Sequence, residues 1–593
     1  MIPPDTMLNL LHLARCILIS ATVCLSLLST ARAETYYVDA SNNQTGSDGL
    51  SWKNAFKTLQ EALTVYDRGD TILMAKGVYH PGTTSADTYL FRGAVTIQGG
   101  FPSGGGVSAD PLTHKTVLSG DYTESLPDTN GDGVPDGGPA VNSSHHIMTL
   151  HEPAGPTVLD GLWFVSGHSQ SGGFLEPGGS AILAVDGGVL TLNRCYFYFN
   201  DTDADLGTAV CYINDPEASP QALEVSQCVF QQNGNNSTPY AYGALYVENH
   251  SLQLTDTLFV ENYSQYGGGL YFEGLDGPGF EPHSHIARCQ FKGNYAHRFG
   301  GAVYTFTKIN LEVVNTLFSG NHAGHYGFSN TGGGGVYIRH NGEAVFTNNT
   351  FAYNTCGGSI DKYPAYGGAV LFAGNGFSGT TTFSNNIFHQ NWGAGGFSPL
   401  QMSVHVDGQT ARTPAFYSNY SDSEDLPNAD PAEPNFTPFQ ADAPPTLTFQ
   451  SPINLTVSTV GDHTRFLKSS AGYLHLPPDS GLIDLTRKKY LVHPWDDEDA
   501  DGKLRSLGYA PDPGAFEARP APGTKKIIDI EYTGSQIRLY FLTDAPVDIH
   551  RSDDLQDWSS YNVIQNQSRS PIVFGISSSV PMQYYRLSHT AQE

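Results

Sequence analysis

The chain has 593 residues, and 58 Asp and Glu against 30 Lys and Arg leave a net charge of -28. A chain of this length exceeds one ordinary globular core, so several domains or a solenoid are expected. The acidic balance argues against DNA, RNA or anionic membranes as partners. It suits an extracellular protein, and it makes cations candidate ligands.

The first 33 residues are predicted to be an export signal. Arg15 precedes an apolar run from Cys16 to Leu28, and Ala31-Arg32-Ala33 has the A-x-A form of a cleavage site. The run is short for a membrane span. We therefore expect cleavage near Ala33, a secreted or cell-surface protein, and no transmembrane segment in the mature chain.

A short amphipathic helix is predicted near the start of the mature chain. Between Ala55 and Tyr66, apolar residues recur on one side of a helix. A helix at the mouth of a solenoid covers the exposed core and the unpaired edge. Strands around Thr71–Ala75 and Ala94–Gln98 are expected to begin the first coil.

The segment DTNGDGVPD is a candidate calcium loop. It places Asp128, Asn130, Asp132 and Asp136 between glycines, in a spacing similar to that of known calcium loops. Ca²⁺ takes six to eight oxygen ligands, and carboxylates on a tight turn can converge on one ion. No Glu follows at the twelfth position, so complete EF-hand ligation is not expected. A solvated acidic turn is the alternative.

The middle of the chain repeats a unit of roughly 30 residues. Each unit carries Phe-x-x-Asn, and most units continue into a glycine-led strand such as GGAVY. The seven asparagines are Asn200, Asn233, Asn262, Asn294, Asn321, Asn354 and Asn391. Units that vary in length but keep fixed positions indicate a solenoid. Short alternating strands with Gly and Asn between them predict a right-handed parallel β-helix.

Two fixed columns are predicted to be structural. The Phe of each repeat should lie in the core. The Asn should lie at a turn, where it tolerates a left-handed backbone and its amide can hydrogen-bond along the stack. Two residues before each Phe stand Cys195, Cys228, Thr257, Cys289, Thr316, Asn349 and Asn386. Because this column accepts Thr and Asn, we favour a structural role over a reactive thiol. No disulfide framework is predicted for the cysteines.

The glycine-led strand is predicted to have an inner and an outer face. Side chains alternate along a strand, and one column is always aliphatic, so it should face the core. Its neighbours should then point outward. One neighbouring column is small, from Ala181 to Ala369. The other contains Tyr246, Tyr271, Tyr304 and Tyr337.

The four tyrosines are candidate glycan-binding residues. Successive strands of a sheet lie about 4.8 Å apart, so the rings should form one outward stripe. The small column beside them is expected to leave the rings uncovered for stacking against sugars. The alternative is a ladder of rings that only shields the sheet.

No catalytic residue is assigned, and three candidates remain. Glu248 and Glu273 should lie on neighbouring coils, two positions beyond the tyrosines, and Arg339 follows in the same column. Paired carboxylates about 5 Å apart serve retaining glycosidases or hold a cation. A solvated acidic patch is the alternative. His297 and Arg298 are expected in a loop beside this face.

The end of the chain is predicted to differ from the repeats. Residues 397 to 470 are expected to form long loops that close the solenoid. Asp497, Asp499 and Asp501 in DEDADG are a weaker candidate calcium set. We expect a β-helix with caps over residues 34–517, a linker at 518–523 and a small antiparallel β-sandwich at 524–593. The last segment alternates strongly, as in KIIDIEY and QIRLYFL.

Several stretches together resemble one group of exported bacterial proteins. They are SDGLSWKNAFKTLQEAL, GDTILMAKGVY, VTIQGGF, LDGLWFVSG, and the NNTFAYN and GGAV repeats. The chain is similar to β-helix proteins related to the chlamydial polymorphic outer membrane protein repeats. Residues 481–517 resemble the choice-of-anchor Q ending of such proteins. The resemblance implies the fold and adhesion-like surface roles, and it carries over no catalytic residue.

Three functions remain open from the sequence. The favoured one is a non-enzymatic exported β-helix that binds glycans or surfaces. The second is a polysaccharide lyase or glycoside hydrolase acting on an extracellular polysaccharide. The third is a purely structural surface protein. Fold alone does not decide among them.

Overall fold

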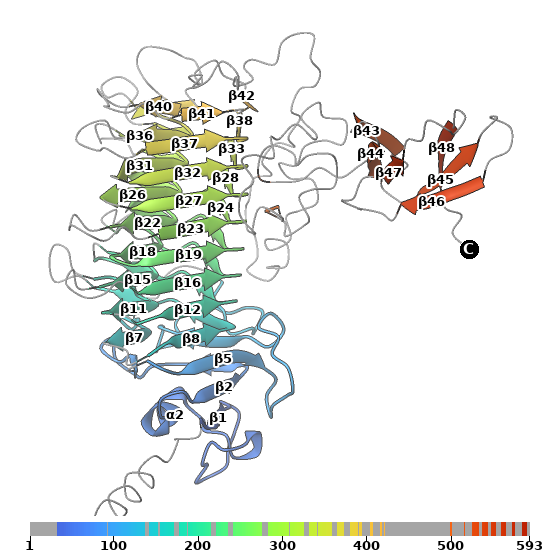
Figure 1. Cartoon of the computed structure of the whole chain (residues 1–593). Helices are drawn as coiled ribbons and strands as arrows, with labels where there is room; N and C mark the ends of the chain where they lie inside the picture. The colour runs from blue at the N-terminus through green and yellow to red at the C-terminus, as the bar shows by residue number, and fades with distance from the viewer. Residues whose placement is uncertain are drawn as a thin grey trace, which may run out of the picture.

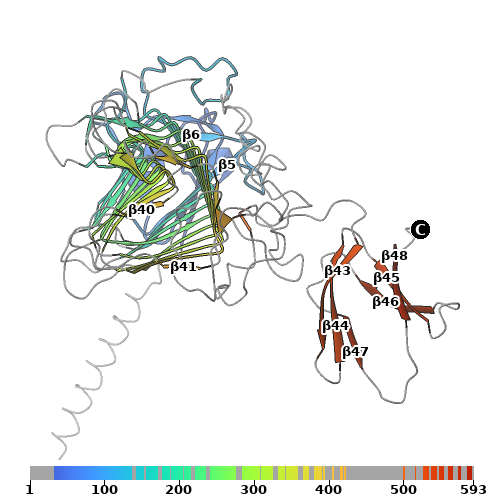
Figure 2. The same cartoon turned by 90° about the horizontal axis from the view of Figure 1, so that it is seen from above.

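The chain forms a parallel β-helix, seen from the side in Figure 1 and from above in Figure 2. A computed structural model describes residues 33–393 apart from residues 92, 137–141, 152–154, 171–176, 187, 205, 215–220, 235–240, 275–282, 308, 325–330, 341, 358–364, 373–379 and 390. It also describes residues 404–406, 415–417, 420–421, 499–500 and 515, and six strands between 525 and 589.

Three long sheets run along the helix, and each full coil gives one strand to each sheet. Sheet A has twelve parallel strands. They are β1 (Thr35–Val38), β2 (Thr71–Ala75), β5 (Thr96–Phe101), β8 (Thr157–Asp160), β12 (Leu190–Asn193), β16 (Ala222–Ser226), β19 (Ser251–Thr255), β23 (His283–Ala287), β27 (Asn310–Val314), β32 (Glu343–Thr347), β37 (Thr380–Ser384) and β41 (Ala415–Tyr417).

Sheet B follows sheet A in each coil and has eleven strands. They are β3 (Gly77–Tyr79), β6 (Thr116–Ser119), β9 (Leu162–Val165), β13 (Tyr196–Tyr198), β17 (Val229–Gln231), β20 (Leu258–Val260), β24 (Gln290–Lys292), β28 (Leu317–Ser319), β33 (Thr350–Ala352), β38 (Ile387–His389) and β42 (Tyr420–Ser421).

Sheet C has ten strands and contains the glycine-led segments. They are β4 (Tyr89–Phe91), β7 (Met148–His151), β11 (Ile182–Val185), β15 (Val210–Ile213), β18 (Leu245–Glu248), β22 (Leu270–Glu273), β26 (Val303–Thr307), β31 (Val336–His340), β36 (Val370–Phe372) and β40 (Val404–Val406).

Short strands bridge sheet B to sheet C. Seven of them form sheet D, namely β21 (Tyr263–Tyr266), β25 (Tyr295–Phe299), β29 (His322–Ala323), β30 (Thr331–Gly332), β34 (Thr355–Cys356), β35 (Ala365–Tyr366) and β39 (Trp392–Gly393). A separate pair consists of β10 (His168–Ser169) and β14 (Asp201–Thr202).

The cap at the start of the helix is shorter than predicted. A 3-10 turn, η1 (Trp52–Asn54), precedes α2 (Leu59–Val65). Thr58 and Glu61 form a capping box, which fixes the first helical residue at Leu59. Phe56 lies before the helix and pairs with Val38 at the edge of β1. The strand predicted at Thr71–Ala75 is confirmed.

Near the C-terminus the alternating segments form antiparallel strands, as expected. One sheet has β43 (Lys525–Tyr532), β44 (Gln536–Thr543) and β47 (Ile572–Gly575), and another has β46 (Ser559–Ile564), β45 (Val547–Ser552) and β48 (Tyr584–His589). Their packing as a sandwich, and the domain boundaries, stay predictions.

The repeated Phe and Asn residues form two ladders inside the helix. Phe164, Phe197, Phe230, Phe259, Phe291, Phe318, Phe351 and Phe388 stack with centroid separations between 4.5 and 5.2 Å. Each Asn side chain from Asn200 to Asn354 donates to the Asn of the next coil, as in the 2.9 Å bond from Asn294 to Asn321. The left-handed backbone lies one residue earlier than predicted, at Gly293 with a φ of 61°.

The small column faces the core, which corrects the expected outward orientation. Ala181, Ala209, Ala244, Ala302 and Ala369 belong to the main core cluster. A Cβ at Gly269 would lie 3.0 Å from the Phe291 ring. Strict alternation does not apply here because the strands begin at the next residue, and these positions belong to the turn. Small residues leave the space that the phenylalanine rings fill.

The tight approach between coils gives a first testable prediction. A Cβ at Gly301 would lie 2.2 Å from the carbonyl oxygen of Gly334, whereas a Cβ at Gly293 has only a side-chain carbon at 3.6 Å. We expect Gly301→Ala to lower the free energy of unfolding by about 3 kcal/mol. Gly293→Ala should cost only about 1 kcal/mol from its left-handed backbone. Urea unfolding followed by circular dichroism measures both, and equal effects would contradict the packing argument.

Candidate functional site

The paired carboxylates lie where the sequence places them. Glu248 on β18 and Glu273 on β22 are register partners in adjacent coils of sheet C. Their column continues through Phe306 to Arg339, so Arg339 lies two coils beyond Glu273. Both glutamates are partly exposed. The predicted adjacency of the two carboxylates is confirmed, and Arg339 does not adjoin them.

One tyrosine hydroxyl connects the two glutamates. Tyr246 Oη lies 3.0 Å from Glu248 Oε2 and 3.1 Å from Glu273 Oε2. The hydroxyl of Tyr271 also hydrogen-bonds Glu273. Burial raises the pKa of the Glu248 carboxyl, and the hydrogen bond with Tyr246 offsets this only in part. The two carboxyl groups therefore have different surroundings.

The four tyrosines form one outward column, but their rings are not accessible. Tyr246, Tyr271, Tyr304 and Tyr337 stack with centroid separations of 5.1, 4.8 and 4.9 Å. They form a cluster separate from the main core, and the exposed fractions of their side chains are only 2–7 %. The expectation that the rings are uncovered is wrong. Their assignment to glycan binding stays untested.

A second layer of aromatic rings covers the tyrosines. It consists of Tyr242, Tyr266, Phe299 and Tyr366, which we call the outer aromatic column. Parallel pairing aligns these positions through Gly332. Each ring lies just before a glycine-led strand, and three of the rings cover a tyrosine of the next coil. The separations are 5.0 Å for Tyr242 on Tyr271, 5.3 Å for Tyr266 on Tyr304 and 4.6 Å for Phe299 on Tyr337.

The outer aromatic column is partly exposed, and sequence reasoning missed it. The signal was present, because Tyr242, Tyr266, Phe299 and Tyr366 each immediately precede a glycine. The repeat pattern did not predict that the chain turns sharply at that glycine. This turn lays three of the rings, those of Tyr242, Tyr266 and Phe299, over a tyrosine of the following coil.

Two arginines lie beside this aromatic layer. Arg298 donates through Nη1 to the Tyr266 hydroxyl at 2.8 Å. The Arg339 guanidinium lies 4.7 Å from the centroid of Phe306 and hydrogen-bonds Tyr304. His297 and Arg298 belong to β25, which corrects the expected loop. His297 is buried and packs edge-on against Tyr295.

The acidic loop uses its carboxylates for turns and for an ion pair. Asp128 accepts from the backbone N–H groups of Asp132 and Gly133, at 3.2 and 2.8 Å. Asp136 accepts from the N–H of Thr129 at 2.8 Å. Asn130 accepts from the N–H of Asp132 at 2.9 Å. Asp132 pairs with the ammonium of Lys115, and this ammonium also lies 4.5 Å from the Trp163 ring centroid.

In this arrangement the four candidate ligands of the loop do not point toward one common site. Among the described residues, no group of three or more His, Cys, Asp or Glu side chains is arranged to hold a metal ion. The loop instead lines a pocket of about 870 Å³ together with Lys76, Thr113 and Lys115. Calcium binding by the loop stays a prediction. In the weaker set, Asp497 and Asp501 lie outside the described residues, and Asp499 is buried.

The contacts of the cysteine column support the favoured structural role. Burial without a disulfide is common to its cysteines, Cys195, Cys228 and Cys289, and to Cys211 and Cys356 outside it. Burial raises the pKa of the Cys289 thiol, which opposes a reactive thiolate. The N–H of Cys195 donates to Cys228 Sγ at 3.4 Å, and the N–H of Cys289 donates to Thr316 Oγ1 at 3.3 Å. The column therefore accepts hydrogen bonds between coils.

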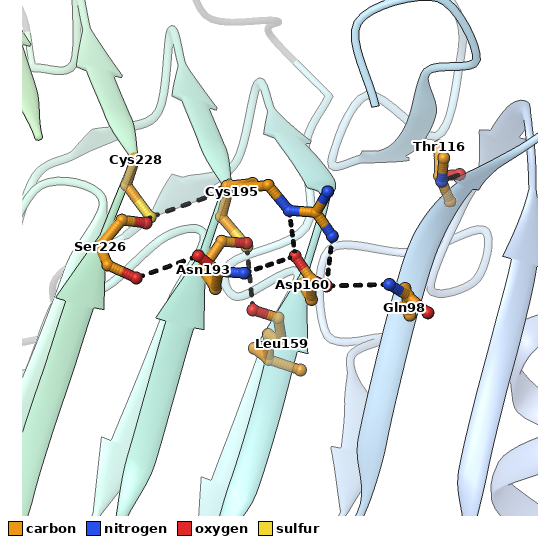
Figure 3. Close-up of polar contacts among 10 residues, drawn as sticks. Gln98, Thr116, Leu159, Asp160, Asn193, Cys195, Ser226 and Cys228 are labelled. Carbon is orange, nitrogen blue, oxygen red and sulfur yellow. Dashed lines mark hydrogen bonds and ion pairs between the residues drawn. The ribbon is translucent and has the colours of Figure 1, made fainter. Parts of the chain in front are cut away.

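A polar cluster at the corner between sheets A and B is also structural (Figure 3). Asp160 accepts two bonds from the Arg194 guanidinium, at 2.8 and 2.5 Å. It also accepts from Gln98 and Asn193, both at 3.0 Å. Ser226 donates to Asn193 Oδ1 at 3.0 Å. The Asp160 oxygens are therefore fully engaged, which leaves no acceptor for a ligand.

Comparison with known proteins supports the fold. The family described as "Right handed beta helix region" matches residues 270–411, and together with the stacked parallel sheets this supports a right-handed β-helix. The match does not show that the chain belongs to the polymorphic outer membrane protein or choice-of-anchor Q families. No curated protein sequence matches the chain.

Three solved structures are similar to this chain. A GH136 lacto-N-biosidase from Eubacterium ramulus has 10 % identity and a TM-score of 0.26, covering 67 % of this chain and 69 % of that one. A rhamnogalacturonan lyase has 12 % identity and a TM-score of 0.27, covering 65 % and 87 %. A tailspike protein of E. coli bacteriophage HK620 has 12 % identity and a TM-score of 0.22, covering 60 % and 69 %.

These likenesses are too weak to carry any functional argument. In the part of the chain that the structure describes, no helix is both long and apolar enough to cross a membrane.

Proposed function

We propose that the protein is an exported or cell-surface β-helix that binds a polysaccharide along the outer face of sheet C. The observation that carries the proposal is the partly exposed outer aromatic column of Tyr242, Tyr266, Phe299 and Tyr366. Aromatic faces pair a large apolar surface with polar tips, which suits the apolar faces and hydroxyl groups of sugars.

The dimensions of the column favour an extended ligand over a single sugar. Its four aromatic positions and Gly332 span four spacings between adjacent strands, which is roughly 19 Å. Glu248 and Glu273 lie on one flank of the column, and Arg298 contacts Tyr266 within it. Carboxylates and guanidinium groups can hydrogen-bond sugar hydroxyls between the stacked rings. The site therefore suits a ligand of several consecutive sugar units.

Single substitutions in the outer aromatic column test the proposal. Removing one stacking ring costs about 1.4 kcal/mol or somewhat less, so Tyr266→Ala and Phe299→Ala should each weaken binding by about 5- to 10-fold. The measurement is affinity electrophoresis of residues 34–593 in gels containing xylan, laminarin, dextran or polygalacturonate.

Trp392→Ala is the matched control, because Trp392 is a half-exposed aromatic residue on β39, outside the outer aromatic column. Its binding should match that of the unmodified chain. Melting temperatures of all three variants separate lost binding from lost folding. Unchanged migration of Tyr266→Ala and Phe299→Ala in every gel would contradict the proposal.

A further inference from the structure

We propose that Glu248 and Glu273 are the acid and the nucleophile of a retaining glycoside hydrolase site, which cleaves the polysaccharide held by the outer aromatic column. The inference rests on the proposed function, because the column supplies the binding. It goes beyond that function by adding a reaction and by giving each carboxyl group a separate role.

The spacing of the two carboxyl groups fits a retaining mechanism better than an inverting one. One hydroxyl contacts both Oε2 atoms, at 3.0 and 3.1 Å. The two oxygens are therefore at most about 6 Å apart, which is below the 6.5–9.5 Å of inverting enzymes and allows the 5–5.5 Å of retaining ones. The register of β18 and β22 fixes this spacing, since both glutamates lie on parallel strands of one sheet.

The hydrogen bonds divide the roles between the two glutamates. A tyrosine hydroxyl has one proton, so Tyr246 can donate to only one of its two carboxyl partners. The other contact becomes a hydrogen bond when that carboxyl is protonated and donates to Tyr246 Oη. Glu273 also has the hydroxyl of Tyr271 beside it, whereas burial favours the neutral form of Glu248 and raises its pKa. In the proposed reactive state Glu248 is therefore protonated, and Tyr246 donates to the Glu273 carboxylate in place of Glu248.

Tyr271 connects the carboxyl pair to the outer aromatic column. Tyr271 hydrogen-bonds Glu273 through its hydroxyl, and Tyr242 of the outer aromatic column stacks on the Tyr271 ring at 5.0 Å. On the other flank, Phe306 pairs in register with Glu273 and packs beneath the Arg339 guanidinium. A chain of sugars bound at Tyr242 would therefore lie close to Glu273, and Glu248 is the register partner of Glu273 in the adjacent coil. This arrangement distinguishes the site from a solvated acidic patch.

The reaction balances with water as the only co-reactant. A Glu273 oxygen forms a bond to the anomeric carbon as the glycosidic C–O bond breaks, and Glu248 gives its proton to the departing oxygen. A water molecule then attacks the anomeric carbon of the glycosyl ester and transfers a proton to Glu248. The ester bond breaks, Glu273 leaves as a carboxylate, and the sugar retains its anomeric configuration.

The test is polysaccharide cleavage by the chain of residues 34–593. Xylan, laminarin, dextran and polygalacturonate are incubated with the protein, new reducing ends are counted, and the first anomer released is identified by NMR. We expect new reducing ends of retained configuration. Glu273→Gln and Glu248→Gln should each lower the rate by roughly 100- to 10,000-fold while leaving affinity and melting temperature nearly unchanged.

The control variant is Glu343→Gln, because Glu343 is an exposed carboxylate on β32 of sheet A, away from the site. It should cleave at the unmodified rate. Binding without products, unsaturated product ends, or full activity of Glu273→Gln would overturn the hydrolase inference and leave the proposed binding function standing. Absence of both binding and products would overturn the two proposals together.

Discussion

Replacing Asn294 by Ala is expected to lower the free energy of unfolding by about 4 kcal/mol. Asn294 is fully buried, and its amide makes four bonds within the ladder. Nδ2 donates to Phe259 O at 3.0 Å and to Asn321 Oδ1 at 2.9 Å. Oδ1 accepts from Asn262 N at 3.2 Å and from Asn262 Nδ2 at 2.8 Å. Alanine leaves all four partners buried without that contact.

The cost is large because four buried polar groups lose a partner at once. A buried donor or acceptor left without a partner costs about 1–3 kcal/mol, and a chain of bonds through successive amides adds to the effect of each. Urea unfolding followed by circular dichroism measures the change. The matched control is Asn43→Ala, an exposed Asn in the N-terminal segment, which should change stability by less than about 0.5 kcal/mol.

Hydrogen exchange gives a second and local readout. Each coil contacts chiefly its neighbours, so a damaged coil should open locally before the whole helix unfolds. Amides in β20, β24 and β28 should lose protection in Asn294→Ala, while amides in β2 and β5 should not. If Asn294→Ala behaves like Asn43→Ala in both measurements, the ladder does not stabilise the fold.

The sequence was sufficient for features that one repeat determines by itself. The Phe of each repeat must be buried, and the Asn three residues after it has the amide needed to bond its copies in the adjacent coils. Both depend only on the recurrence of a residue at a fixed place in the coil. The adjacency of Glu248 and Glu273 follows for the same reason, since equal positions in adjacent coils become register partners.

Features that depend on the path of the chain between strands were not predicted. The small column was assigned outward because alternation was extended past the start of the strand, into a turn. The tyrosines were expected to be exposed because their cover, the outer aromatic column, comes from the preceding coil. The ion pair of Asp132 with Lys115, which comes from an earlier segment, was also not predicted. In each case the deciding contact depends on how the chain turns outside the alternating strands.

Replacing Phe291 by Ala is expected to lower the free energy of unfolding by about 3–5 kcal/mol. The ring is fully buried and stacks between Phe259 at 4.7 Å and Phe318 at 5.2 Å. Its removal opens a cavity that the neighbouring rings cannot fill, because their own coils hold them at fixed heights. Phe291→Leu, which keeps most of the volume, should cost only about 1.5 kcal/mol.

A double-mutant cycle with Gly269 tests whether the small column exists to accommodate these rings. A Cβ at Gly269 would lie 3.0 Å from Phe291 Cδ1, so Gly269→Ala should destabilise the unmodified chain by overpacking. In the Phe291→Ala background the ring is absent, and the same methyl group enters the cavity. We expect Gly269→Ala to be less costly there, with a coupling of about 1 kcal/mol between the two sites. Additive effects would mean that the small residues serve the turn and not the ring beside it.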